Sequence, residues 1–144
     1  MKTLENLNTI KKNIIFRADL NVPVFKGKIT DFSRIDSIIP SINRLIKNKN
    51  KVFIIAHYGR PKGKVQEKFS INFLCKVLAD KFKVPKIHFL KTFDNKAIKK
   101  KILEIHYGEI CLFENIRFYE EEEKNDLNFS KDLSSNFDFF INDA

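Results

Sequence analysis

Four of the five arginines stand beside apolar segments that resemble strands, and their chemistry suggests a site for an anion. These are Arg17, Arg34, Arg60 and Arg117, whereas Arg44 lies inside a helix-like segment. Lysine is the ordinary cation of this chain, with twenty-two of the 27 basic residues. A guanidinium is a planar fork that binds phosphate or carboxylate through two parallel hydrogen bonds, which an ammonium cannot do. A small anion carrying both groups would suit these arginines.

Other polar residues follow the same apolar segments. They are Asp19 and Asn21 after the first, His57 and Gly59 after the second, Glu114 and Asn115 after the fourth, and Asn142 and Asp143 in the fifth. Taken alone, each has a structural alternative. His57 is also compatible with a hydrogen-bonded histidine at a strand end, and Asp19 with a cap on the turn before Pro23. With only five arginines in the chain, their position beside the strand-like segments could also arise by chance.

Five short, nearly continuous apolar runs predict strands that are covered on both faces. They occupy residues 13–20, 51–57, 86–90, 109–115 and 137–143. Helix-like segments lie between them at 33–49, 70–82, 95–105 and 128–136. Ser33 and Asp36 predict a capping box for the first helix, and Ser70 predicts the N-cap of the second. Pro40 interrupts the first helical segment and predicts a kink or a separate first turn.

The alternation of strands and helices predicts an α/β fold with a parallel sheet and right-handed crossovers. Ligands of such sheets bind beyond the carboxyl ends of the strands. The arginines and their polar neighbours therefore belong to one edge of the sheet, and together they predict a binding site.

Composition limits the possibilities. The chain has 144 residues, which fits one domain, and its net charge of +9 suggests phosphorylated or polyanionic partners or simply good solubility. No apolar run is long enough to cross a bilayer and the first thirteen residues contain no apolar h-region, so we expect a cytoplasmic protein. Cys75 and Cys111 lie in apolar segments and predict reduced core cysteines rather than a disulfide or a metal pair.

The stretch "GRPKGK" does not form a P-loop. That motif needs four residues between its glycines and then Lys followed by Ser or Thr. Here three residues separate Gly59 from Gly63, and Val65 follows Lys64. The sequence has no G-x-G-x-x-G motif, zinc-ligand spacing or nucleophile elbow either. The sequence thus predicts no nucleotide cradle and no metal site.

Three separated motifs closely resemble the phosphoglycerate kinase family. They read "RADLNVPVFKGKITDFSRI", "AHYGRPKGK" and "FENIRFYEEEEKND…FINDA". The resemblance runs in order along almost the whole chain and covers roughly the first third of such an enzyme. It implies reversible phosphoryl transfer between 1,3-bisphosphoglycerate and ADP, giving 3-phosphoglycerate and MgATP in glycolysis.

The family resemblance also implies an architecture. Such enzymes are usually monomers with two Rossmann-like domains joined by a hinge. The N-terminal domain binds the phosphoglycerate and the C-terminal domain binds MgATP or MgADP. Residues 1–144 are then expected to form an incomplete N-terminal domain, a Rossmann-like parallel sheet with helices on both faces. No nucleotide or metal is expected to bind to this part, and no nucleic acid or membrane is an expected partner.

By resemblance, the substrate-binding residues are Asp19, Asn21, Arg34, His57, Gly59, Arg60 and Arg117. Arg60 and Arg117 would hold the non-transferred phosphate, with His57 nearby. Asp19 and Asn21 would contact the hydroxyl and carboxylate of the glycerate.

Arg34 would face the transferring group and is the expected catalytic residue. The chain departs from the family pattern at Tyr58, where leucine is usual, and at Ala18, where valine is usual. It stops at "INDA", where the family continues with "FGTAHR", whose arginine belongs to the phosphate site. We therefore expect weak phosphoglycerate binding and no phosphoryl transfer by these residues alone. The alternatives are an inert truncated fragment or decayed gene product and, more remotely, a basic nucleic-acid-binding module.

Overall fold

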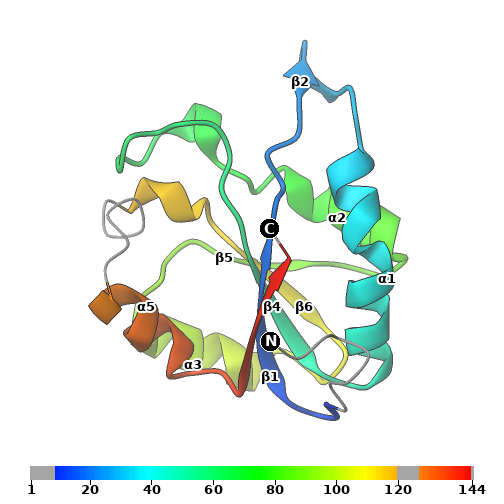
Figure 1. Cartoon of the computed structure of the whole chain (residues 1–144), viewed down its shortest axis with the longest axis vertical. Helices are drawn as coiled ribbons and strands as arrows, with labels where there is room; N and C mark the ends of the chain where they lie inside the picture. The colour runs from blue at the N-terminus through cyan, green and yellow to red at the C-terminus, as the bar shows by residue number, and fades with distance from the viewer. Residues whose placement is uncertain (1–8, 120–126, 144) are drawn as a thin grey trace.

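The five apolar runs form one sheet in a computed structural model that describes residues 9–119 and 127–143. All adjacent strands are parallel, in the order β5-β6-β4-β1-β7 (Figure 1). The strands are β1 (Asn13–Ala18), β4 (Lys51–Ile55), β5 (His88–Leu90), β6 (Ile110–Phe113) and β7 (Phe139–Asp143). The prediction of a parallel α/β sheet is confirmed.

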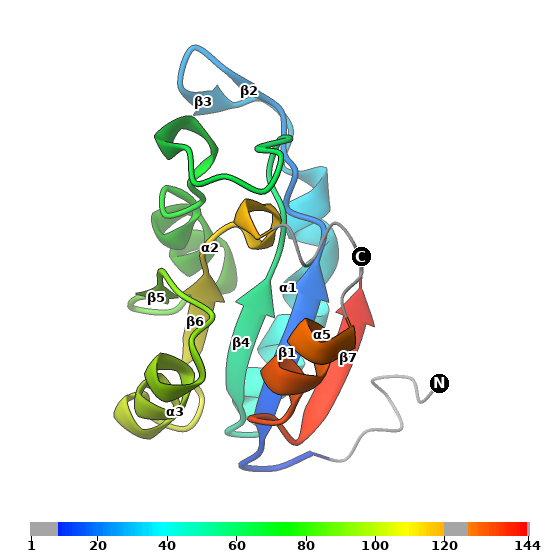
Figure 2. The same cartoon turned by 90° about the vertical axis from the view of Figure 1, so that its left-hand side faces the viewer.

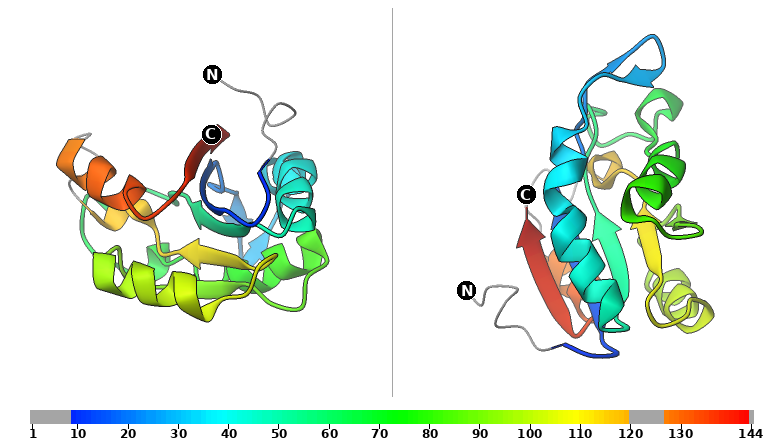
Figure 3. Two further views of the ribbon diagram at one scale, coloured as in Figure 1. Left: turned by 90° about the horizontal axis from the view of Figure 1, so that it is seen from below. Right: turned by 90° about the vertical axis from the view of Figure 1, so that its right-hand side faces the viewer.

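Helices cover both faces of this sheet (Figure 3). One face packs against α1 (Ser33–Lys47) and α2 (Leu74–Phe82), and the other against α3 (Asn95–Glu104) and α5 (Leu127–Ser134). Successive strand residues alternate between the two cores. In β4, for example, Val52 and Ile54 join the first core and Phe53 and Ile55 the second. Because both faces of β1, β4 and β6 are buried, these strands carry nearly continuous apolar runs. The edge strand β7 differs: Phe139 and Phe140 are 37% and 48% exposed, so the prediction that this strand is covered on both faces is wrong.

Both predicted helix caps are wrong. Ser33 is the first residue of α1 and makes no side-chain cap, because the Asp31 carboxylate accepts the Ser33 N–H at 2.8 Å in its place. The second helix begins at Leu74, four residues later than predicted. The Ser70 hydroxyl instead donates to the Glu114 carboxylate at 2.7 Å. At Ser33 the helix has already begun, and Asp31 two residues earlier binds an N–H of its first turn. At Ser70 the chain first makes a turn, so the helix starts only at Leu74.

Pro40 lies within α1, which runs as one helix from Ser33 to Lys47. The helix buries Ile35, Ile38, Ile42 and Leu45 on one face. That apolar stripe packs on the sheet and contributes more than the hydrogen bond that the proline removes, since packing supplies most of a protein helix's stability.

Both cysteines are free thiols, as predicted. Burial raises the pKa of the Cys75 thiol to about 11 and that of the Cys111 thiol to about 12. Because the thiolate is the reactive form, both thiols stay protonated and inert at neutral pH.

A short hairpin precedes α1 and was not predicted from the sequence. It pairs β2 (Val24–Phe25) with β3 (Lys28–Ile29). The two loop residues, Lys26 and Gly27, have φ values of 51° and 77°. Positive φ at both positions is typical of a type I′ turn, whose twist matches that of the strands it joins.

Lysine occupies every left-handed backbone position that is not glycine in the part of the chain that the structure describes. These positions are Lys11, Lys26, Lys49, Lys62 and Lys83. Lys83 ends α2 with φ 58° and ψ 46°, and its N–H bonds to the carbonyls of Ala79 and Asp80. Glycine is the residue that favours such a C-terminal position, because it has no Cβ to meet the following carbonyl.

Replacing Lys83 with glycine is expected to raise the free energy of unfolding by about 1 kcal/mol, since it relieves the left-handed strain. A urea melt followed by circular dichroism measures the change. Lys76→Gly is the matched control, because Lys76 is exposed in the interior of α2. That change should lower stability by about 1 kcal/mol. A Lys83→Gly chain no more stable than the original would contradict the prediction.

Candidate functional site

The carboxyl ends of the strands gather the polar residues, as predicted. Figure 2 shows the strand arrows pointing to one edge, where the connecting loops and the β2–β3 hairpin lie. Asp19 and Asn21 follow β1, residues 57–60 follow β4, and residues 114–117 follow β6. Three separate segments of the chain therefore form this edge.

Arg34 binds the segment that leaves β1. Its Nη1 donates to the Asp19 carboxylate at 3.1 Å and to the Asn21 carbonyl at 2.6 Å. The same Asp19 oxygen accepts the Asn21 N–H at 3.1 Å. Side chains of Arg34 and Asp19 remain 47% and 41% exposed. The guanidinium is thus oriented at the edge of the sheet while its charge stays accessible to a ligand.

Asn21 connects this segment to the loop after β4. Its Oδ1 accepts the Gly59 N–H at 3.1 Å. The oxygen is therefore engaged by the protein, and the amide nitrogen is the part of Asn21 that can donate to a ligand.

Gly59 is required by the shape of this loop. It has φ 64°, and a Cβ at this position would lie 2.4 Å from two carbons of the Phe69 ring. Arg60 follows it and is exposed, and Pro61 is buried. Further along, the Gly63 N–H donates to the Arg117 carbonyl at 3.2 Å, which joins the loop to the segment after β6.

Arg117 lies in a single helical turn, η3 (Ile116–Phe118), shortly after the end of β6. Its N–H donates to the Asn115 side chain at 3.1 Å. Arg117 and His57 are both partly buried. His57 lies two residues beyond the end of β4.

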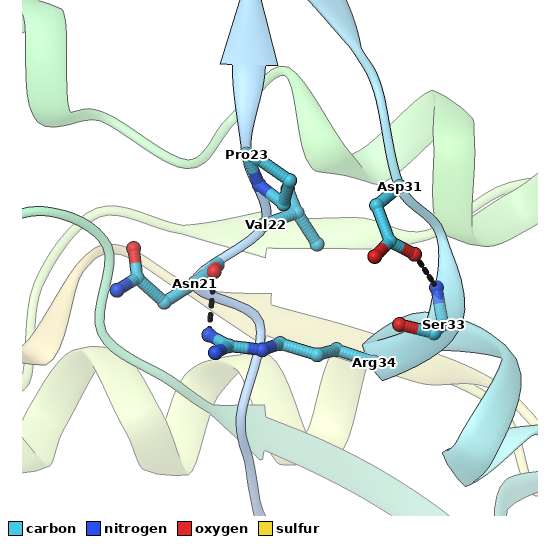
Figure 4. A pocket seen from close by; sticks show the side chains of 6 residues that line it. All are labelled: Asn21, Val22, Pro23, Asp31, Ser33 and Arg34. Atoms are coloured by element: carbon cyan, nitrogen blue, oxygen red, sulfur yellow. Dashed lines mark hydrogen bonds between the residues drawn. The ribbon is translucent and has the colours of Figure 1, made fainter.

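A pocket of about 380 Å³ lies beside Arg34. Figure 4 shows the residues that line it: Asn21, Val22, Pro23, Asp31, Ser33 and Arg34. The pKa of Asp31 is lowered by the hydrogen bond from the Ser33 N–H, so Asp31 is anionic at neutral pH. The volume falls within the range of small-molecule sites. Asp31 and Ser33 were not predicted as site residues, because only the fold brings them opposite Asn21.

The structure therefore unites most of the predicted residues. Direct hydrogen bonds join Asp19, Asn21, Arg34 and Gly59. His57 and Arg60 share the Gly59 loop, and Arg117 is joined to it through backbone bonds. The pocket itself is lined by only two of the predicted residues, Asn21 and Arg34. Asn142 and Asp143 lie beside Arg17 and Ala18 in the pairing of β7 with β1, at the same edge.

The chemistry available here is the orientation of an anion. Among residues 9–119 and 127–143, no group of three or more His, Cys, Asp or Glu side chains is placed to hold a metal ion. Fixed guanidinium groups and backbone amides act on a ligand through charge and position.

Comparison with known proteins identifies the family that this chain resembles. The family model described as phosphoglycerate kinase matches residues 4–144. The phosphoglycerate kinase of Prochlorococcus marinus (strain MIT 9515) is 39% identical over 145 residues, covering 100% of this chain and 36% of that protein. The phosphoglycerate kinase of Mesorhizobium japonicum is 40% identical, covering 99% of this chain and 36% of that protein.

Solved structures agree with these sequence matches. The phosphoglycerate kinase structure from Coxiella burnetii superposes with a TM-score of 0.85 at 33% identity, covering 97% of this chain and 34% of that one. The phosphoglycerate kinase from Pyrococcus horikoshii OT3 gives a TM-score of 0.85 at 30% identity, covering 100% of this chain and 36% of that one. The chain spans about a third of the length of the relatives it matches.

Proposed function

This chain belongs to the phosphoglycerate kinase family, and we propose that the edge around Arg34 is the phosphoglycerate-binding site of such an enzyme. The proposed reaction is reversible phosphoryl transfer between 1,3-bisphosphoglycerate and ADP, giving 3-phosphoglycerate and ATP in glycolysis. The observation that carries the proposal is the exposed guanidinium of Arg34. It is oriented by Asp19 and by the Asn21 carbonyl beside a pocket of about 380 Å³.

The proposed roles follow from what phosphoryl transfer requires. Little covalent chemistry falls to the protein, so catalysis rests on positioning and on stabilising the charge of the transferred oxygens. Arg34 supplies charge for the transferring group, as the catalytic residue. Arg60 and Arg117 hold the phosphate that is not transferred, with His57 beside them.

The glycerate end of the ligand is assigned to Asp19 and Asn21. A carboxylate such as that of Asp19 accepts a hydrogen bond from the substrate hydroxyl. The amide nitrogen of Asn21 donates to the substrate carboxylate, because the amide oxygen is already bonded to the Gly59 N–H. The backbone of Gly59 thereby takes part in positioning the substrate.

We assign residues 1–144 to the N-terminal, substrate-binding domain of the enzyme, of which they form a part. In this proposal MgATP or MgADP binds to the remaining two thirds of the enzyme's length, and residues 1–144 alone do not transfer phosphate. The enzyme acts in the cytoplasm as a monomer. Among the described residues, no helix is both long and apolar enough to cross a membrane. The comparisons do not favour an inert fragment or a nucleic-acid-binding module over this function.

Titration of the ¹⁵N-labelled chain with 3-phosphoglycerate tests this function. We expect saturable amide shifts at Arg34, His57, Gly59 and Arg60, and weaker shifts with glycerate or inorganic phosphate alone. Asn21→Asp is a sharp variant, because it keeps an acceptor for the Gly59 N–H but loses the amide donor. It should bind at least about tenfold more weakly while keeping the fold. The absence of saturable shifts at these residues would refute the proposed site.

A further inference from the structure

Two buried polar residues lie beneath the candidate site, and neither is assigned to the substrate. Glu114 is 8% exposed and Asn115 is 0% exposed. Both directly follow β6. Burying such groups is unfavourable unless they are fully hydrogen-bonded. Their hydrogen-bond partners therefore indicate what they do.

The Asn115 side chain uses its whole hydrogen-bonding capacity within the protein. Its Oδ1 accepts the Tyr58 N–H at 3.2 Å and the Arg117 N–H at 3.1 Å. Its Nδ2 donates to the Tyr58 carbonyl at 2.6 Å and the Phe69 carbonyl at 2.9 Å. An amide offers two acceptor positions and two donor hydrogens, so none is left for a ligand.

Three of these four bonds reach residues distant in the sequence, Tyr58 at 57 positions and Phe69 at 46 positions from Asn115. Asn115 holds both backbone polar groups of Tyr58, which lies between His57 and Gly59. It also holds the backbone of Arg117. One side chain thus fixes the loop that carries Arg60 relative to the turn that carries Arg117.

Glu114 holds a further segment of the chain, the turn that follows Phe69. Its carboxylate accepts the Ser70 hydroxyl at 2.7 Å and the N–H groups of Ile71 and Asn115, each at 2.9 Å. The turn at residues 69–71 is thereby held in place, and it carries the Phe69 ring that lies against Gly59. The Glu114–Asn115 pair therefore supports the Gly59 loop through hydrogen bonds and through packing.

We propose that Asn115 is a positioning residue of the phosphate site, which sets the spacing between the Arg60 and Arg117 guanidinium groups. The inference rests on the proposed function and deepens it. Two guanidinium groups bind one phosphate tightly only when both reach its oxygens at once. A shift of about 1 Å in one of them is enough to lower activity a hundredfold in well-organised sites.

The structure supplies a matched control for this role. Asn50 is also 0% exposed and makes four side-chain hydrogen bonds, with Lys12, with two atoms of Thr9, and with Leu45. It lies just before β4, at the opposite edge of the sheet. Asn50→Ala and Asn115→Ala each remove four side-chain hydrogen bonds, but only Asn115 lies at the proposed site.

The test measures the affinity of both variants for 3-phosphoglycerate in the full chain, at a temperature where circular dichroism shows them folded. We expect Asn115→Ala to bind at least about tenfold more weakly and Asn50→Ala to bind within about twofold of the original chain. We also expect Asn115→Ala alone to shift the ligand-free amide signals of residues 58–60 and 117. Asn115→Ser, which keeps one hydroxyl in the cavity, takes its place if Asn115→Ala does not fold, with the same expected outcomes.

Three results would overturn the inference. If Asn115→Ala binds like the original chain, or if both variants weaken alike, Asn115 serves stability only. If the original chain shows no saturable binding, the proposed function fails and this inference with it. The first two results leave the proposed function intact, so the two failures are distinguishable.

Discussion

Gly59→Ala is expected to weaken 3-phosphoglycerate binding at least about tenfold, because the loop that carries Arg60 must move to accommodate a methyl group. At φ 64°, a Cβ would lie 2.4 Å from Cδ1 and Cε1 of Phe69. The backbone that carries this ring is held in place, because the Asn115 amide donates to the Phe69 carbonyl and the Ser70 hydroxyl donates to Glu114. Isothermal titration calorimetry with 3-phosphoglycerate measures the loss.

A control variant at a second glycine, Gly27, distinguishes the effect of the clash from that of the backbone strain. Gly27 has φ 77°, and a Cβ at this position would meet no atom within 4 Å apart from its chain neighbours. Gly27→Ala should therefore lose only about 1–2 kcal/mol of stability from the left-handed backbone and leave the affinity unchanged. Gly59→Ala should lose more stability than this, since it adds the clash. Equal affinity in the two alanine variants would show that the Gly59 loop does not position the ligand.

Arg34→Lys is expected to weaken 3-phosphoglycerate binding by about 1.5–3 kcal/mol, which corresponds to roughly 10–150-fold. Both contacts of Arg34 with Asp19 and Asn21 use Nη1. Because these two bonds take both N–H groups of Nη1, we expect the edge formed by Nε and Nη2 to face a ligand. An ammonium cannot satisfy the Asp19 carboxylate and the Asn21 carbonyl and still present a fork to a phosphate.

The matched control for Arg34→Lys lies in the same helix. Arg44 is in the last turn of α1, away from the pocket. Arg44→Lys should bind 3-phosphoglycerate like the original chain. Neither variant should change the unfolding free energy by more than about 1 kcal/mol, because the Arg34–Asp19 ion pair is nearly half exposed. If the Arg34→Lys chain binds 3-phosphoglycerate with unchanged affinity, Arg34 does not contact the ligand.

The sequence was sufficient to predict the strands and their approximate limits. Residues 52–56, for example, are apolar at every position because helices cover both faces of the sheet there. The β2–β3 hairpin was missed because strands of two residues are too short to show a period. The strand order β5-β6-β4-β1-β7 was not predicted either, since periodicity within a strand carries no information about its neighbours.

The residues of the site were easier to predict than their contacts. Polar residues at the ends of parallel strands meet at one edge, whatever the strand order, so the grouping of Asp19, Gly59 and Arg117 followed from the fold class. The contacts depend on segments distant in sequence. The local sequence predicts that Ser70 caps a helix, but its hydroxyl donates to Glu114, 44 residues away. In the sequence, Asn115 is one of several polar residues at strand ends. Only its four hydrogen bonds in the structure show that it differs from the others.

A crystal structure of the chain with 3-phosphoglycerate would test the central claim most directly. We predict the ligand phosphate within about 2.7–3.2 Å of nitrogens of Arg60 and Arg117, and the ligand carboxylate at the Asn21 amide. The opposite edge of the sheet offers a clear contrasting result. It has a depression of about 440 Å³ lined by residues that include Lys47, Lys49 and Lys83. A ligand bound there, with the arginine edge empty, would contradict the account.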